Sequence, residues 1–159
     1  MTTTIWDIDG TILMNDLPQP DWDDPNGIHP TTGENIYGDM TEYNKHAYLN
    51  PQLRTTDLGA INHLLTGRPS TRRDLTLGAL QTLGIPVRTI AFWPAQETYS
   101  RAKCLEWKAQ ALWWRQARYY VDDDPAYRAD LTALLEKRRI SCRCISVAEW
   151  QRMKNAGVI

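Results

Sequence analysis

The stretch Tyr119–Pro125, YYVDDDP, joins the end of an apolar strand to three consecutive carboxylates and a proline. Adjacent like charges repel, and burying them without partners is costly. The proline is explained if a helix begins there, because proline suits the first helical turn. The three aspartates after a core strand still need a reason, and the surrounding sequence supplies one.

The composition is that of a globular protein. The 159 residues suffice for one domain, 1–159, with a sizeable core, and 42% of them are hydrophobic and 23% charged. The formal net charge of −1 gives no overall basic field for nucleic acid or an anionic membrane. No apolar stretch has the length of a membrane span, no secretory signal is visible, and the three cysteines form no disulfide framework. We therefore expect a cytoplasmic protein.

Strand and helix patterns alternate along most of the chain. This alternation with short connections predicts an α/β, Rossmann-like fold, in which a mostly parallel sheet is covered by helices on both faces. In such sheets the ligand site lies beyond the carboxyl ends of the strands. The predicted strands are Thr3–Ile8, Ala60–Leu65, Val87–Phe92, Arg118–Val121 and Ile140–Ile145, and the predicted helices are Arg72–Leu83, Ser100–Trp114, Pro125–Lys137 and Val147–Asn155.

The segment from about Met14 to Gln52 breaks this alternation. It is rich in Pro, Asp, Asn and Gly but carries four large aromatic residues. A long segment of this kind inside a compact domain is usually functional or disordered. We interpret it as an irregular flap that edges the site, with no full cap domain, so that a large substrate can enter.

Polar side chains follow the predicted strands and would meet at one edge of the sheet. Carboxylates crowd together where a hard cation neutralises them, and Mg²⁺ takes a few oxygen ligands together with water. One carboxylate can then act as a nucleophile toward phosphorus, while a second transfers protons. The residues at this edge are Asp7, Asp9, Gly10, Thr11, Thr66, Gly67, Arg68, Lys103, Asp122 and Asp123.

Four of these motifs resemble a known family when they are taken in order. WDIDGT, LLTGR, a lysine in a later helix and VDDD resemble the signature motifs of the haloacid dehalogenase superfamily, over about Ile5 to Asp124. The second aspartate of the first motif is typical of the phosphatase branch. The resemblance therefore implies a Mg²⁺-dependent phosphomonoesterase that acts through an aspartyl-phosphate.

The resemblance also implies a role for each matched residue. The catalytic residues would be Asp7 as nucleophile, Asp9 as general acid and base, Thr66 as the hydroxyl of the second motif, and Lys103. The substrate phosphate would lie against Gly10, Thr11, Gly67 and Arg68. The magnesium ligands would be Asp7, the Asp9 carbonyl, Asp122 and Asp123, whereas Asp124 would cap the next helix.

Two lysines can fill the place of the third motif. Lys103 lies near the predicted start of its helix, the end that faces the site in this fold, and we prefer it for that reason. Lys108 would lie about one helical turn further away.

A second similarity concerns the substrate. The run AKCLEWKAQAL, 102–112, is similar to the lysine helix in the phosphatase half of phage polynucleotide kinase/phosphatase enzymes, which implies a nucleic-acid terminal phosphate. A basic rim would suit such an end, although arginines also solvate helix ends. The candidate rim is Arg68, Arg72, Arg73 and Arg101. We interpret the cluster of Trp107, Trp113 and Trp114 as core and rim packing rather than as a platform for stacked bases.

Other interpretations remain open. Taken singly, DxDG can be a turn, TGR is a common turn, and VDDDP can be a helix cap with solvated neighbours. A small-molecule phosphatase, a phosphotransferase and a non-catalytic phosphate-binding or regulatory module all fit the same fold. The complete set of motif residues favours an enzyme that acts on a phosphorylated substrate, with no membrane partner and with the oligomeric state left open.

Overall fold

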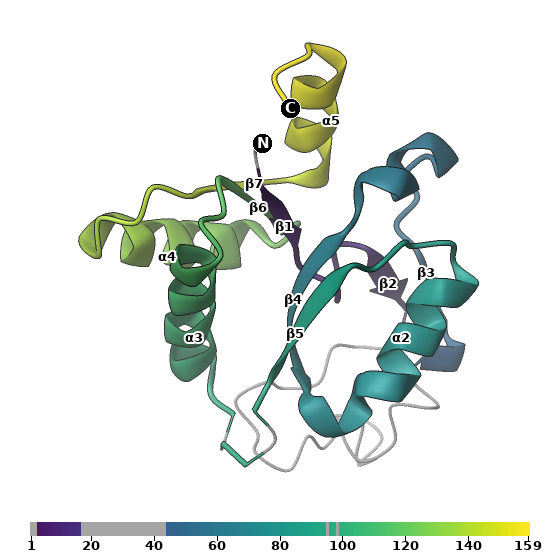
Figure 1. Ribbon diagram of the computed structural model, residues 1–159, viewed down its shortest axis with the longest axis horizontal. Coiled ribbons are helices and arrows are strands. Elements are labelled where there is room, and N and C mark those ends of the chain that lie inside the picture. Colours follow the sequence, from purple (N-terminus) through teal and green to yellow (C-terminus); the bar gives the residue numbers. More distant parts are fainter. Residues whose placement is uncertain (1–2, 17–43, 95, 98) are drawn as a thin grey trace.

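The computed structural model describes residues 3–16, 44–94, 96–97 and 99–159, and it confirms the predicted α/β class. Five parallel strands form one sheet in the order β5-β4-β1-β6-β7, with helices against it (Figure 1). The strands are β1 Thr4–Trp6, β4 His63–Pro69, β5 Thr89–Trp93, β6 Tyr119–Val121 and β7 Arg143–Ile145. The α-helices are α2 Arg73–Thr82, α3 Arg101–Trp114, α4 Pro125–Lys137 and α5 Val147–Asn155.

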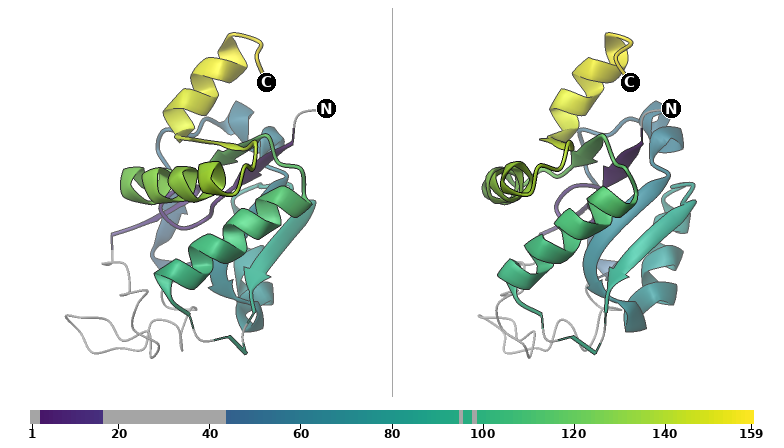
Figure 2. Two further views of the ribbon diagram at one scale, coloured as in Figure 1. Left: turned by 90° about the vertical axis from the view of Figure 1, so that its left-hand side faces the viewer. Right: turned by 60° about the vertical axis from the view of Figure 1, so that its left-hand side comes forward.

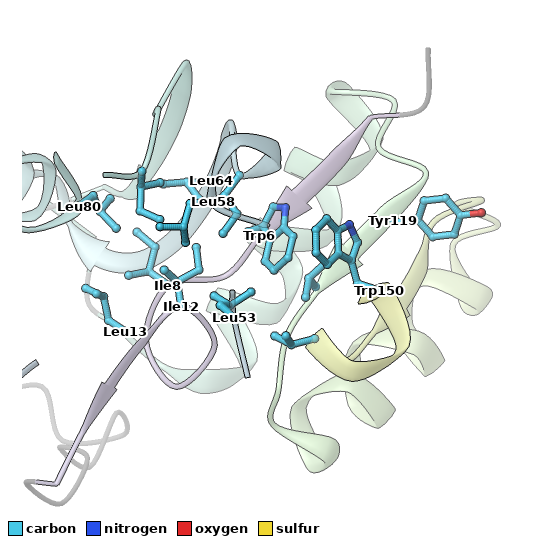
Figure 3. Packing of buried hydrophobic residues seen from close by; sticks show 14 of the residues in the cluster. Trp6, Ile8, Ile12, Leu13, Leu53, Leu58, Leu64, Leu80, Tyr119 and Trp150 are labelled. Carbon is cyan, nitrogen blue, oxygen red and sulfur yellow. The ribbon is translucent and has the colours of Figure 1, made fainter. Parts of the chain in front are cut away.

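The helices cover the two faces of the sheet in pairs. Successive strand residues point to opposite faces, so Ile5 packs with the buried residues of α3 and α4, while Trp6 packs with Leu80 of α2 and Trp150 of α5. The two views in Figure 2 show α3 and α4 together on one side of the sheet. On the other side the rings of Trp6 and Trp150 meet edge to face at 4.7 Å (Figure 3).

A short antiparallel ribbon lies beside the main sheet and was not predicted. Strand β2, Leu13–Asn15, pairs with β3, Ala47–Leu49. Both strands lie within the segment interpreted as an irregular flap. They are three residues long, which is too short to produce a readable alternation of apolar and polar residues. The rest of the flap prediction, residues 17–43, lies outside the described residues.

The predicted strand at Ala60–Leu65 begins later than expected. Thr55–Ala60 forms a 3-10 helix, η1, and β4 starts at His63. A second 3-10 helix, η2, spans Ser70–Arg72 and leads directly into α2. In the described part of the chain, none of the helices combines the length and the apolar character that a membrane crossing would require.

Side-chain caps fix where three of the helices begin. Ser100 accepts a hydrogen bond from a backbone N–H in the first turn of α3, and Ser146 does the same for α5. Asp124 caps α4 by accepting from the N–H groups of Ala126 and Tyr127 at 3.0 and 3.3 Å. The expected capping role of the third aspartate is therefore confirmed.

Asp57 of η1 joins the middle of the chain to α5. Its carboxylate, 5% exposed, accepts from the Arg54 N–H at 2.8 Å, from Gln151 at 3.0 Å and from Lys154 at 3.0 Å. Burial alone would raise the pKa of Asp57, but the hydrogen bonds from Arg54, Lys154 and Gln151 outweigh it and hold this pKa below 3.8. The ionised form is therefore the one that stabilises the fold.

We expect Asp57→Asn to lower the free energy of unfolding at pH 7 by about 1–3 kcal/mol, because three donors, of Arg54, Gln151 and Lys154, lose a buried, charged acceptor. A carboxyl group with a lowered pKa stabilises the fold above its unfolded-state pKa, and this stability is lost as the pH falls through the folded-state value. The difference in unfolding free energy between the wild-type protein and the variant should thus persist from pH 7 to about pH 4 and shrink below that pH. Urea titrations at several pH values measure this. The exposed Glu136, changed to Gln, serves as the control, and equal deficits in the two variants would contradict the anchoring role.

Candidate active site

Strand register brings Asp7 and Asp122 together. β1 and β6 are parallel neighbours in which Trp6 lies opposite Val121, and each is the last residue of its strand. The following residues, Asp7 and Asp122, therefore leave the sheet side by side. The N–H of Asp7 donates to the Val121 carbonyl at 2.9 Å, which extends the pairing one residue further. Both aspartates are buried, at 8% and 4% exposure.

A cavity of about 330 Å³ opens at this edge of the sheet, where the sequence predicted a site. Four carboxylates line it against two basic side chains. Among the predicted site residues, those that line it are Asp7, Asp9, Gly10, Gly67 and Asp122. Its other lining residues are Met14, Tyr99, Arg101, Cys104, Lys108, Asp124 and Tyr127. The predicted residues that are not part of the lining are Thr11, Thr66, Arg68, Lys103 and Asp123.

Lys108 is the lysine that reaches Asp7. Its ammonium group donates to Asp7 Oδ1 at 3.0 Å and to the Tyr120 hydroxyl at 2.7 Å, and only 4% of the residue is exposed. The ring of Tyr127 lies 4.9 Å from the same nitrogen. A buried ammonium needs a paired charge and hydrogen-bond acceptors, and Asp7 and Tyr120 provide both.

The structure therefore corrects the preference for Lys103. Lys103 is exposed and lines a separate hollow, although it does lie in the first turn of α3 as expected. Lys108 lies five positions further along the helix, which turns the two side chains about 140° apart around its axis. The face of the helix decides which lysine enters the site, and distance from the helix start does not. Lys108 shares its face with Cys104 and Leu112, which are buried against the sheet.

Burial and mutual repulsion act on the ionisation of these groups. Burial and the charge of Asp9 raise the pKa of Asp7, while Lys108 opposes them. Burial, followed by the charge of Asp7, raises the pKa of Asp122 to about 7. Burial would lower the pKa of Lys108, but Asp7 outweighs it and keeps that pKa well above the ordinary value. The site thus places the charged ammonium group of Lys108 among crowded carboxylates.

Thr11 and Asp123 support the site from behind. The Thr11 hydroxyl donates to Asp7 Oδ2 at 3.1 Å and accepts from the Asp123 N–H at 3.0 Å. Asp123 Oδ1 accepts from the Val147 N–H at 2.8 Å, and its Oδ2 accepts from Asn50 at 3.0 Å. The structure therefore corrects two expectations: Thr11 holds the Asp7 carboxylate instead of facing substrate, and Asp123 ties loops together instead of facing a metal.

Arg68 is a buried partner of Asp9. Its guanidinium donates to both carboxylate oxygens of Asp9, at 2.9 and 2.7 Å, and also to Asn44 and Thr76. The Arg68 side chain is 0% exposed, so it orients Asp9 and does not form part of an open phosphate-binding surface. Thr66 Oγ1 accepts from the Arg68 N–H at 3.0 Å. This hydroxyl is therefore used within the turn of the TGR motif and does not face the cavity.

The expected basic rim is largely engaged within the protein. Arg68 is held by Asp9, and Arg101 forms an ion pair with Asp130 at 2.6 Å. Arg73 lies 5.7 Å from the centre of the Phe92 ring. Arg68 is therefore not available to an open basic rim, whereas Arg101 still lines the cavity and Arg73 is exposed.

Two glycines, Gly10 and Gly67, line the cavity with backbone and carry no side chain that would occupy it. Gly10 has φ +76°, a conformation that glycine adopts without strain. A Cβ atom on Gly67 would lie 3.4 Å from Cys104 Sγ and 3.4 Å from the Tyr99 ring. A methyl group at position 67 would therefore lie in van der Waals contact with Tyr99 and Cys104.

Asp7 and Asp122 are the side chains best placed to hold a cation. Within the described ranges, no group of three or more His, Cys, Asp and Glu side chains is arranged to hold a metal ion. Magnesium keeps several waters and is commonly bound through one or two carboxylates, so two aspartates are a sufficient donor set. Burial and the charge of Asp7 raise the pKa of Asp122, and a divalent cation between the two carboxylates would offset both effects.

Several residues of the site had no recognisable signal in the sequence. Asn50 donates to the Thr11 carbonyl at 2.8 Å as well as to Asp123, yet it lies in the segment that reads as irregular. Tyr99 and Tyr127 form the aromatic wall of the cavity, and both resemble ordinary packing residues in the sequence. Only their position beside helix starts that face the site could have indicated them.

Comparisons with known proteins support the fold. Neither a family model nor a curated protein matches the sequence. Among solved structures, the chain is similar to a chain in the structure of the Pnkp1/Rnl/Hen1 RNA repair complex, with a TM-score of 0.57 and 16% identity. The match covers 92% of this chain and 42% of the other, so the protein spans less than half the length of its structural neighbour. An identity this low shows the shared fold alone.

Proposed function

We propose that the protein is a Mg²⁺-dependent phosphomonoesterase of haloacid dehalogenase type that forms an aspartyl-phosphate on Asp7. One observation carries the proposal: the Asp7 carboxylate lies in the cavity, held by Lys108 on one oxygen and by Thr11 on the other, directly beside Asp122. A structural ion pair would need Lys108 and Asp7 alone. The additional buried carboxylate is a cost to stability that a binding or catalytic role explains.

In the first step an Asp7 oxygen attacks the phosphorus atom, and the bond from phosphorus to the ester oxygen breaks. Lys108, hydrogen-bonded to Asp7, supplies positive charge beside the transferring group. Asp9 gives a proton to the leaving oxygen. Arg68 orients Asp9, and each carboxylate oxygen keeps a second lone-pair site that can face the cavity.

In the second step a water molecule attacks the phosphorus atom of the aspartyl-phosphate. The bond between phosphorus and the Asp7 oxygen breaks, inorganic phosphate leaves, and the proton of the attacking water passes to Asp9. The two steps together return Asp7 to its carboxylate form and Asp9 to its protonated form. An acceptor alcohol in place of water would give phosphotransfer instead of hydrolysis, with the same residues in the same roles.

Magnesium would be held by Asp7 and Asp122, where it supplies the charge that draws a phosphate group toward two carboxylates. The fit rests on the donor set: hard oxygen ligands, side by side, with the pKa of Asp122 raised to about 7 by burial and Asp7. Asp123 is not part of this set, because it does not line the cavity and its oxygens accept hydrogen bonds from Asn50 and Val147.

The proposed substrate is a nucleic-acid terminal phosphate. The similarity of 102–112 to the lysine helix of polynucleotide phosphatases supports it. The fold shared with a chain from an RNA repair complex is consistent with it. The competing candidates are a phosphatase of small metabolites and a phosphate-binding module without turnover.

A panel of phosphorylated compounds tests the proposal. It contains p-nitrophenyl phosphate, free nucleotides, and oligonucleotides with a 3′- or a 5′-phosphate, each assayed with Mg²⁺ and with excess chelator. We expect phosphate release that disappears with the chelator and returns when Mg²⁺ is added, because the crowded carboxylates then regain their counter-charge. Turnover that continues in excess chelator would contradict the magnesium site. No release from any compound would leave the binding module.

A further inference from the structure

A second hollow lies beside α3, apart from the cavity that holds Asp7. Its volume is about 780 Å³, and we call it the α3 hollow. It is lined by three indole rings, those of Trp93, Trp107 and Trp113, together with polar side chains that include Lys103 and Gln110. Residues 103, 106, 107, 110 and 113 of α3 share the helix face that does not contain Lys108, at the spacing of one helical stripe.

Trp113 of the α3 hollow and its neighbour Trp114 are too exposed to be core residues. Trp93 is buried and Trp107 half-buried, and their rings lie edge to face with centroids 5.6 Å apart. Trp113 is 57% exposed and Trp114 next to it is 70% exposed. The expectation of core and rim packing holds for Trp107, which packs against the core, and leaves Trp113 and Trp114 at the rim. Adjacent exposed indoles are costly in water and commonly mark a binding surface.

The α3 hollow adjoins the cavity of Asp7. Tyr99 lines that cavity, and its ring packs edge to face on the Trp93 ring of the hollow, with the ring centroids 5.6 Å apart. At the start of α3, Arg101 lines the cavity while Ala102 and Lys103 line the hollow. A flexible ligand with one end at Asp7 can therefore extend past Tyr99 and reach the indoles without crossing the protein core.

The charges around the α3 hollow indicate which part of a ligand it suits. Two basic side chains, Lys103 and Arg138, are balanced by Glu97 and Glu106, and Arg138 is ion-paired with Glu106. With no excess of positive charge, the hollow is a poor site for a phosphate. Indole faces suit a flat aromatic ring, and the Gln110 amide can both donate and accept hydrogen bonds at such a ring's edge.

We propose that the α3 hollow binds an unpaired nucleobase of a single strand whose phosphorylated end lies at Asp7. The inference rests on the proposed function for the position of that end. It explains how a protein of net charge −1, whose candidate rim arginines Arg68 and Arg101 are engaged, would hold nucleic acid. Stacking on aromatic side chains, rather than contact with backbone phosphates, supplies the affinity.

The test measures binding of a fluorescent, unphosphorylated single strand by anisotropy, in ribo- and deoxyribo- forms. Trp113→Ala should weaken binding by about 5- to 160-fold, the range of one stacked base. Trp114→Ala is the matched control, because it removes a neighbouring indole that is even more exposed and does not line the hollow. We expect it to change binding less than about threefold, which allows for its 5.5 Å contact with Trp113.

A base deletion identifies the partner of Trp113. An abasic site placed at each position near the end of the strand should, at one position, weaken binding to the wild-type protein as much as Trp113→Ala does. The Trp113→Ala variant should bind this abasic strand as tightly as it binds the intact strand, because the variant has already lost the stacking interaction. Affinity should also vary little with salt, in contrast to binding through phosphates.

The outcomes separate this inference from the proposed function. Equal binding by the two tryptophan variants, or abasic sites without effect, would overturn the nucleobase site, even if phosphate release is observed. A change of oligomeric state in Trp113→Ala would overturn it in favour of an interface between copies of the chain. Conversely, strands that bind through Trp113 to a protein without phosphatase activity would remove the proposed function and leave the nucleobase site, because the probe carries no phosphate.

Discussion

Replacing Asp7 with Asn should lower turnover of p-nitrophenyl phosphate by at least about 1000-fold, the scale of losing a covalent nucleophile. The amide keeps the size of the side chain and can still accept from Lys108 through its oxygen, so the fold should be retained. The amide oxygen is a far weaker nucleophile than a carboxylate, so the aspartyl-phosphate does not form. Steady-state kinetics beside a circular dichroism spectrum would measure both points. Turnover within tenfold of the wild-type value would exclude Asp7 as the nucleophile.

Asp9→Asn is the comparison that separates the two carboxylates. It keeps the nucleophile and removes the proton-transfer group, which costs about 100-fold or more. With p-nitrophenolate, which leaves without a proton, the first step should survive while the second slows. Phosphate should then accumulate on Asp7 and be found there by mass spectrometry of peptides. Phosphate on another residue would refute the assignment of roles.

Lys108→Met should lower turnover by about 100-fold or more, the cost of removing one charged donor from a preorganised site. Methionine has nearly the same length and apolar stem, so it fills the space on the buried face of α3. It leaves Asp7 without its ammonium partner and beside Asp122, where the two charges repel. The measurement is kcat for p-nitrophenyl phosphate over a range of Mg²⁺ concentrations.

Lys103→Met is the matched control for this result. Lys103 lies on the same helix but is exposed and outside the cavity, so kcat with this small substrate should stay within about twofold. A small substrate is used because Lys103 lines the α3 hollow. If the two variants lost activity in the reverse order, the lysine in the site would be Lys103, and the placement of the α3 face would be incorrect.

The α/β fold and the strand ends could be predicted because each depends on local pattern. The carboxyl ends of parallel strands meet at one edge, so Asp7 and Asp122 follow from the strand assignments alone. The choice between Lys103 and Lys108 could not be made in this way. Both are compatible with the helix, and the buried face is set by packing against Tyr120 and the sheet, which is a tertiary property.

The supporting contacts were the least predictable part of the site. Arg68 reads as a basic residue near a phosphate, but the structure gives it a buried carboxylate partner, Asp9, 59 positions away. Asn50 and Asp123 are joined over 73 positions, and neither has a local pattern that announces the pairing. Such long-range hydrogen bonds depend on how loops meet, and single-sequence patterns carry no information on that.

The two faces of α3 have a consequence for how such a protein can diverge. One face presents Lys108 to Asp7, and the other presents Trp113 to the α3 hollow. Substitutions on the outward face can change which molecules are retained near the site while the reacting groups keep their positions. Selection, or a library built on 103, 106, 107, 110 and 113, could thus vary preference without rebuilding the chemistry. The same helix would then carry one face whose residues are constrained by the reaction and another face whose residues can change with the ligand.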